Sequence, residues 1–225
     1  MIQRRDALKS KDEPARPVGT IARNRAVWKQ RLVSVSTRMF AGRGFEAVSL
    51  REITREAGLS LPVVYWFFAD KRSLYEACCL HALKASLQRI AVSAANQGDA
   101  REVLLAMTTT LCELHLSGGG TRLLHRLLLD NDSGILAKMV PVLKRSKAFE
   151  ALRRAVQALS PSAQSELETF ALLALVAGFV EHLRLVRLAK IGTAELATPR
   201  SIAMFILSML FRSEDWTETG RGRAG

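Results

Sequence analysis

The sequence predicts an all-α protein in two parts, an N-terminal helix-turn-helix domain followed by a larger helical domain. Apolar residues recur at helical spacing along most of the chain, and from Asp70 onward no segment alternates convincingly as a strand does. Capping residues and breaks rich in glycine or proline separate one helical pattern from the next. The length of 225 residues fits one small domain plus one helical domain of ordinary size.

Residues 1–22 are predicted to form a disordered basic arm, because they are rich in Lys and Arg and have almost no apolar periodicity. The arm lacks the continuous apolar core of a signal peptide, and no later run reaches the roughly twenty apolar residues that span a bilayer. A basic arm before a helix-turn-helix can enter the minor groove. An inert tail is an equally good interpretation.

The first predicted helix carries an apolar stripe of Leu32, Val35, Met39 and Phe40, and residues 42–45 then form a turn.

Residues 49–68 have the pattern of a helix-turn-helix. Ser49 is placed to cap a helix with an apolar stripe ending at Ala57, and Gly58 suits the left-handed position that ends it. Ser60 is expected to cap the second helix, with Pro62 in its first turn. Val64 and Phe68 are predicted to face the core. Leu61, Val63, Tyr65 and Phe67 are then predicted to lie nearer the outward side.

A third helical pattern follows Asp70, and with it the segment from Asn24 to Ala95 resembles the tetracycline-repressor (TetR) family of transcriptional regulators. The resemblance rests on motifs spread over about fifty residues, and ends there. They are Leu32…Met39-Phe40-Ala41…Gly44-Phe45, then Arg51-Glu52-Ile53…Ala57-Gly58-Leu59-Ser60, and Pro62…Tyr65-Trp66…Phe68…Lys71-Arg72…Leu74.

The resemblance implies roles for individual residues. Arg51 matches a position that reaches a base edge, where a guanidinium suits bidentate contact with guanine. Ser49, Tyr65 and Lys71 match phosphate-binding positions, which fix register without reading sequence. The whole predicted DNA-binding set is Ser49, Arg51, Ser60, Leu61, Val63, Tyr65, Trp66, Phe67 and Lys71.

At Leu61, Val63 and Phe67 the family usually has polar or small residues, so the second helix offers few hydrogen-bond donors. Base reading is therefore expected to depend on Arg51, on apolar contact with thymine methyl groups and on DNA shape. Internal packing of these apolar side chains is the alternative.

Charge supports a nucleic-acid partner. The formal net charge is +12, and residues 1–75 hold 15 Lys and Arg against 7 Asp and Glu, a net +8 within one third of the chain. Such asymmetry favours phosphate binding through counterion release, although a generally basic protein would also show it. The three cysteines, Cys78, Cys79 and Cys112, lack CxxC spacing and indicate a reduced, cytoplasmic protein in which they are small core residues.

Residues 73–212 are predicted to form the helical domain, and residues 213–225 a disordered tail. Helices are expected to end near Ala95, to run from Asp99 to Leu116, and to restart at Thr121 and Ser133, with Pro141 kinking or dividing the last of these. Ser160-Pro161 is expected to open the longest helix, which ends near Lys190 and Gly192. Thr198-Pro199 should start the final one.

The last two helices are apolar over more than one face, more than one packed side requires. In the TetR family the equivalent pair forms a dimeric four-helix bundle, so a homodimer reading a roughly palindromic operator is expected. Monomeric core packing is the alternative. The resemblance also implies a small-molecule effector in a cavity of the middle helices. Candidate lining residues are His81, His115, His125, His182, Met107, Met139 and Phe149, without an assigned ligand contact.

The sequence therefore predicts a DNA-binding transcriptional repressor released from its operator by a small molecule. A DNA-binding regulator or nucleoid-associated protein without an effector is the second interpretation. A helical enzyme is a third and weaker one, because no nucleophile–base pair, phosphate loop or paired-carboxylate motif supports it. No metal site, cofactor or membrane partner is expected.

Overall fold

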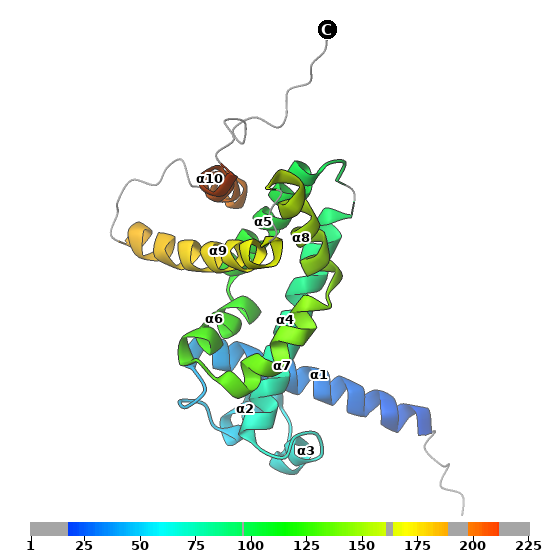
Figure 1. Ribbon diagram of the computed structural model, residues 1–225. Coiled ribbons are helices and arrows are strands. Elements are labelled where there is room, and N and C mark those ends of the chain that lie inside the picture. Colours follow the sequence, from blue (N-terminus) through cyan, green and yellow to red (C-terminus); the bar gives the residue numbers. More distant parts are fainter. Residues whose placement is uncertain (1–17, 96, 161–163, 189–197, 212–225) are drawn as a thin grey trace, which may run out of the picture.

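The computed structural model describes residues 18–95, 97–160, 164–188 and 198–211, and all their regular structure is helical. This confirms the predicted all-α class (Figure 1). In chain order the helices are α1 (Val18–Arg43), α2 (Leu50–Ala57), α3 (Leu61–Tyr65), α4 (Lys71–Ala94), α5 (Ala100–Ser117), α6 (Gly120–Asp130), α7 (Ser133–Lys144), α8 (Lys147–Leu159), α9 (Ser165–Leu188) and α10 (Pro199–Phe211).

Several helix ends lie where the capping residues predicted them. Ser49 and Glu52 exchange hydrogen bonds in a capping box at the start of α2, and Gly58 ends that helix with a left-handed φ of 63°. The Asp99 carboxylate accepts hydrogen bonds from two backbone N–H groups at the start of α5. The Thr198 hydroxyl accepts one from the backbone N–H of Ser201 at the start of α10.

Other boundaries differ from the sequence prediction. Helix α1 begins at Val18, so residues 18–22, assigned to the arm, are helical, and α1 with 26 residues is longer than the 24-residue α9. Helix α7 continues through Pro141 to Lys144, and the chain divides only at Arg145 and Ser146. Ser60 is at the N-cap of α3 in extended conformation, but its side chain makes no capping hydrogen bond. The remainder of the arm, Pro161, Gly192 and the 213–225 tail lie outside the described residues.

Helix α4 connects the two ends of the molecule. It packs against α1, α5, α6, α7 and α8. In Figure 1, α2 and α3 lie with the start of α4 at one end of the molecule, and α5, α8 and α10 lie near the other end. Helix α4 thus provides a rigid element between the helix-turn-helix and the helical domain.

An aromatic cluster joins α1 to α4 beneath the helix-turn-helix. The ring of Tyr75 lies 5.1 Å from that of Phe40 and 4.9 Å from that of Phe45, centroid to centroid. Such pairs add about 0.5–1.5 kcal/mol each beyond their burial. Phe40 and Tyr75 are buried, so their contact holds the end of α1 against the start of α4, next to the helix-turn-helix.

The three cysteines are buried core residues, as predicted. Burial raises the pKa of each of these thiols to about 12, so they stay protonated at neutral pH and are weak nucleophiles. Among the residues described, no helix combines the length and apolar character that crossing a bilayer requires.

Candidate nucleic-acid interface and ligand cavity

Helix α2 is held in place by charged and capping contacts at its first turn. Glu52 accepts hydrogen bonds from the Ser49 hydroxyl at 2.7 Å and from the Ser49 backbone N–H at 2.8 Å, and Arg43 pairs with it at 2.8 Å. These contacts, the Ser49 hydroxyl first, lower the pKa of Glu52 to about 2. The carboxylate is therefore ionised at neutral pH and fixes the start of α2 to the end of α1.

Arg51 is exposed in the first turn of α2. No hydrogen bond or ion pair holds its guanidinium to another described residue, whereas Arg43 and Arg38 pair with Glu52 and Glu56. The Arg51 side chain is thus available for a contact outside the chain. Its predicted role in base contact stays a prediction.

Helix α3 presents two large aromatic side chains to solvent at its C-terminal end. Tyr65 is 54% exposed and Trp66 is 58% exposed, while Leu61 and Phe67 are half-buried. Exposed rings at the end of a short helix form a surface that can meet a duplex backbone or groove.

Val63 is buried, which corrects its predicted outward position. The prediction assumed that one regular α-helix continues from Leu61 to Phe68. The observed α3 has only five residues, and the chain turns from Trp66 onward. Val63 and Val64 are both covered as a result, so Val63 does not offer its methyl groups to a thymine in this conformation. The alternative of internal packing applies at this position.

The first half of α1 contacts the residues that follow α3. The ring centroids of Trp28 and Trp66 are 6.4 Å apart, the Arg25 guanidinium lies 5.9 Å from the centre of the Phe67 ring, and Lys29 lies 5.8 Å from that of Phe68. Helix α1 therefore brings cationic side chains beside α3. The sequence patterns did not indicate this contact, because the cations precede the aromatic residues by about forty positions.

The predicted phosphate-binding residues are partly engaged within the chain. The Lys71 ammonium lies 4.2 Å from the centre of the Phe45 ring and 3.5 Å from the Glu46 carbonyl oxygen, at the start of α4. The Ser49 hydroxyl donates to Glu52 and accepts from its backbone N–H. A phosphate at Ser49 has to share this capping hydroxyl, so Lys71 and Tyr65 are the stronger candidates on geometry.

Comparison with known proteins agrees with this geometry. Residues 32–78 match the family model for bacterial regulatory proteins of the tetR family. The helix-turn-helix segment of this chain is thus similar to that of the TetR family. An uncharacterised helix-turn-helix transcriptional regulator of Bacillus subtilis, YerO, is 32% identical over 62 residues. That match covers 28% of this chain and 22% of the relative, so the two align over only about a fifth of YerO.

Solved structures share the fold along most of the chain. A TetR-like transcriptional regulator from Rhodococcus sp. RHA1 superposes with a TM-score of 0.63 at 19% identity, over 83% of this chain and 95% of that one. The reduced form of NemR from E. coli gives 0.63 at 17%, over 82% and 96%. A tetR-family regulator from Streptomyces coelicolor gives 0.62 at 22%, over 82% and 80%. At these identities the likeness shows the fold alone.

The helical domain of this protein holds a cavity of about 310 Å³. Helices α4, α5, α6, α7 and α9 supply its walls, which are mostly aliphatic. Its polar lining residues are Ser86, His115, Thr121 and His125. A cavity of this size, apolar with a few polar groups, is typical of a small-molecule site.

Of the residues suggested from sequence, His115, His125 and Met139 line this cavity. His81, His182, Met107 and Phe149 do not, and His81 and His182 are exposed. The sequence could not separate these groups, because which helix faces meet in the domain depends on the packing of helices far apart in the chain.

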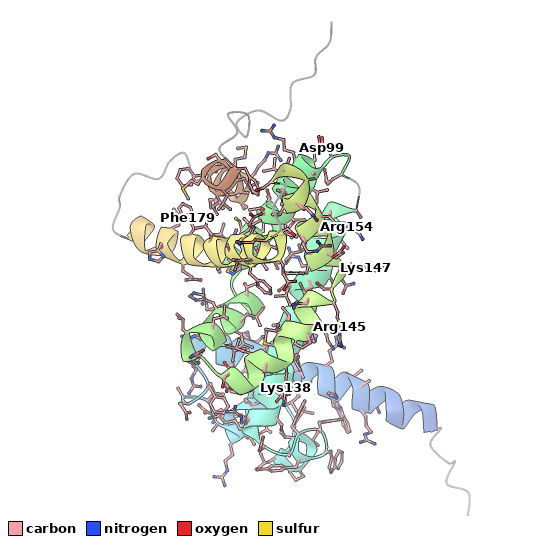
Figure 2. All side chains as sticks on the ribbon, in the orientation of Figure 1. Asp99, Lys138, Arg145, Lys147, Arg154 and Phe179 are labelled. Atoms are coloured by element: carbon pink, nitrogen blue, oxygen red, sulfur yellow. The ribbon has the colours of Figure 1, made fainter. Side chains whose placement is uncertain are left out.

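An apolar surface follows α9 and α10 on the outside of the domain. Leu167 is 64% exposed, Met209 is 48%, and Phe205 and Leu210 are each 41%. The rings of Phe179 and Phe205 are in contact, with centroids 5.3 Å apart, and connect the two helices. Figure 2 labels Phe179 on α9. This surface lies where the sequence predicted helices apolar over more than one face.

Arg126, which the sequence did not single out, connects α6 to the end of α1. Its guanidinium donates to the carbonyl oxygens of Ala41 at 3.1 Å and Gly42 at 3.4 Å. Carbonyls in the last turn of a helix have no partner within it, and a cation there also suits the helix dipole. Arg126 thus links a helix that lines the cavity to the helix that supports α2 and α3.

Proposed function

We propose that this protein is a dimeric transcriptional repressor that binds an operator through α2 and α3 and leaves it when a small molecule occupies the cavity. Such a regulator works in the cytoplasm, where its DNA is. The observation that carries the proposal is the Arg126 contact, because it places a cavity-lining helix against the support of the helix-turn-helix.

The DNA-binding half rests on the family, on charge and on exposed side chains. Residues 1–75 carry a net +8, from 15 basic and 7 acidic residues, and Arg51, Tyr65 and Trp66 are exposed. Phosphate contacts supply most of the affinity in such complexes, and a side chain such as Arg51 supplies preference for a base.

The dimer half rests on the apolar surface of α9 and α10. Large apolar side chains clustered on a surface mark an interface. A two-fold axis through this surface would pair two helix-turn-helix units and match a palindromic operator.

The ligand acts through a difference in its affinity for two conformations. A molecule that prefers the conformation unsuited to the operator lowers operator affinity by no more than that difference. Helix α6 is the element whose position the ligand would bias, because it forms a cavity wall and holds α1 through Arg126.

Fluorescence anisotropy with labelled DNA from upstream of the gene, at a stated salt concentration, tests the proposal. We expect binding by two protomers per site, at least about 1000-fold tighter than to unrelated DNA of equal length. A panel of small molecules added to the complex should contain some that lower this affinity. Equal affinity for both DNAs would contradict specific binding, and would favour a nucleoid-associated role.

A further inference from the structure

We propose that the cavity takes an uncharged, mainly aliphatic small molecule with one polar group, placed against His125. The inference rests on the proposed function and deepens it, because it names the chemical class of the effector. It follows from what lines the cavity, from how its polar side chains are used, and from where it opens.

The walls select for aliphatic groups. Leucines predominate among the lining residues and come from all five helices, while Phe170 is the aromatic ring among them. Leucine side chains present methyl groups in every direction and offer no flat surface for stacking. A ligand made of chains or saturated rings fills such a space better than an extended aromatic one does.

The described lining holds no carboxylate, ammonium or guanidinium group, and its ionisable side chains are the two histidines. Lys144, beside the lining residue Leu143, is already paired with Glu166 across α7 and α9 at 2.6 Å. With both imidazoles neutral, an ion placed in this cavity would lose hydration without gaining a counter-charge, which is strongly unfavourable.

Two of the four polar lining residues, Ser86 and His125, make no hydrogen bond to another described residue, and His125 is the more exposed of the two. The Thr121 hydroxyl donates to the Leu114 carbonyl at 2.5 Å. His115 Nδ1 lies 2.9 Å from the Leu111 carbonyl oxygen, and because a carbonyl only accepts, the proton belongs on Nδ1. The half-buried His125 makes no hydrogen bond to another described residue. Its ring can donate to a carbonyl or accept from a hydroxyl.

Two large apolar residues of the lining are exposed, and we infer that they mark the entrance. The most exposed large apolar residues of the lining are Leu128 of α6, 56% exposed, and Val140 of α7, 43% exposed. An apolar entrance favours a molecule that leaves water readily.

Three probes that share a decyl chain test this class: decan-1-ol, decanoate and decyltrimethylammonium. Calorimetric titration at pH 7.5 into the full chain compares their affinities, with each probe below its aggregation limit. We expect decan-1-ol to bind at least about 100-fold more tightly than either ion, because the ions lose hydration without a counter-charge. Equal or tighter binding of either ion, or no binding of decan-1-ol, would overturn the proposal.

A matched pair of variants locates the site. Leu136→Trp places a larger side chain in the cavity wall, while Ala137→Trp adds the same group at the neighbouring exposed position of α7. The first should weaken decan-1-ol binding at least about 10-fold, and the second should leave it within about 2-fold. Equal effects in the two variants would place the ligand elsewhere. If Leu136→Trp does not fold, the comparison of the three probes on the unaltered chain still decides the ligand class.

Operator release is measured separately in the same samples. If decan-1-ol binds with the expected preference but leaves operator affinity unchanged, the ligand class stands and the repressor switch is wrong. If only a charged probe both binds and releases DNA, the switch stands and the ligand class is wrong.

Discussion

Replacing Arg126 by Met should weaken the attachment of α6 to α1 and lower the stability of the protein. The substitution keeps a long apolar stem but removes two hydrogen bonds, at 3.1 Å to the Ala41 carbonyl oxygen and 3.4 Å to that of Gly42. A hydrogen bond to a charged group contributes about 1.5–3 kcal/mol. Because Arg126 is half-buried and the second bond is long, we expect a loss of about 1–2 kcal/mol for the pair.

Urea unfolding followed by circular dichroism measures this loss. Arg122→Met is the matched control, because Arg122 is exposed one turn earlier on α6, and we expect a change within about 0.5 kcal/mol. If Arg126→Met were as stable as the control, the contact between α6 and α1 would contribute nothing, and the reasoning would be refuted.

The same variant should also uncouple the cavity from the DNA. Leu124, His125, Leu127 and Leu128 line the cavity on either side of Arg126. Allosteric coupling between two sites is about 1–3 kcal/mol, or about 5–150-fold in affinity. We expect the ligand to lower operator affinity severalfold less in Arg126→Met than in the unaltered chain, at equal ligand occupancy. An unchanged ratio would place the coupling in another element, such as α4.

Three further predictions concern the dimer, the thiols and acid. Met209→Glu, which puts a charge in the exposed apolar surface of α10, should convert the proposed dimer to a monomer in light scattering at micromolar concentration; a persistent dimer would mean that this surface is not the interface. The three buried thiols, whose pKa values are raised to about 12, should react with Ellman's reagent only after unfolding, so fast reaction in the native protein would contradict their core role. The pKa of Glu52 is lowered from 4.5 to about 2, so its contribution to stability is present above 4.5 and is lost as pH falls toward 2. Glu52→Gln should therefore show a shallower acid loss of the urea midpoint over that window, and parallel curves would exclude the capping box as the cause.

Local signals predicted much of the fold. Helix boundaries were predicted well where a capping residue is present, because capping depends on residues within one turn. Such residues are Ser49, Gly58, Asp99 and Thr198. Pro141 did not divide the helical pattern. Helix α7 carries it on an exposed face and continues for one more turn.

Contacts distant in sequence were the part that local patterns could not provide. The pairing of Trp28 with Trp66 and the bond from Arg126 to α1 both depend on how α1 lies against other parts of the chain. The cavity could not be predicted from local patterns either, since its walls come from five helices. Periodicity identifies an apolar face but does not say which other face covers it.

The most direct test of the central claim compares Arg51→Ala with Lys71→Ala in operator binding across a range of salt concentrations. Arg51 has an unpaired guanidinium among the described residues and is expected to read a base, while Lys71 is expected to bind phosphate. Arg51→Ala should then reduce the preference for operator over unrelated DNA by about 1–3 kcal/mol, roughly 5–150-fold. Lys71→Ala should weaken both DNAs alike and reduce the salt slope by about 1 per contact. Unchanged preference in Arg51→Ala would contradict the claim that this helix-turn-helix reads its operator through Arg51.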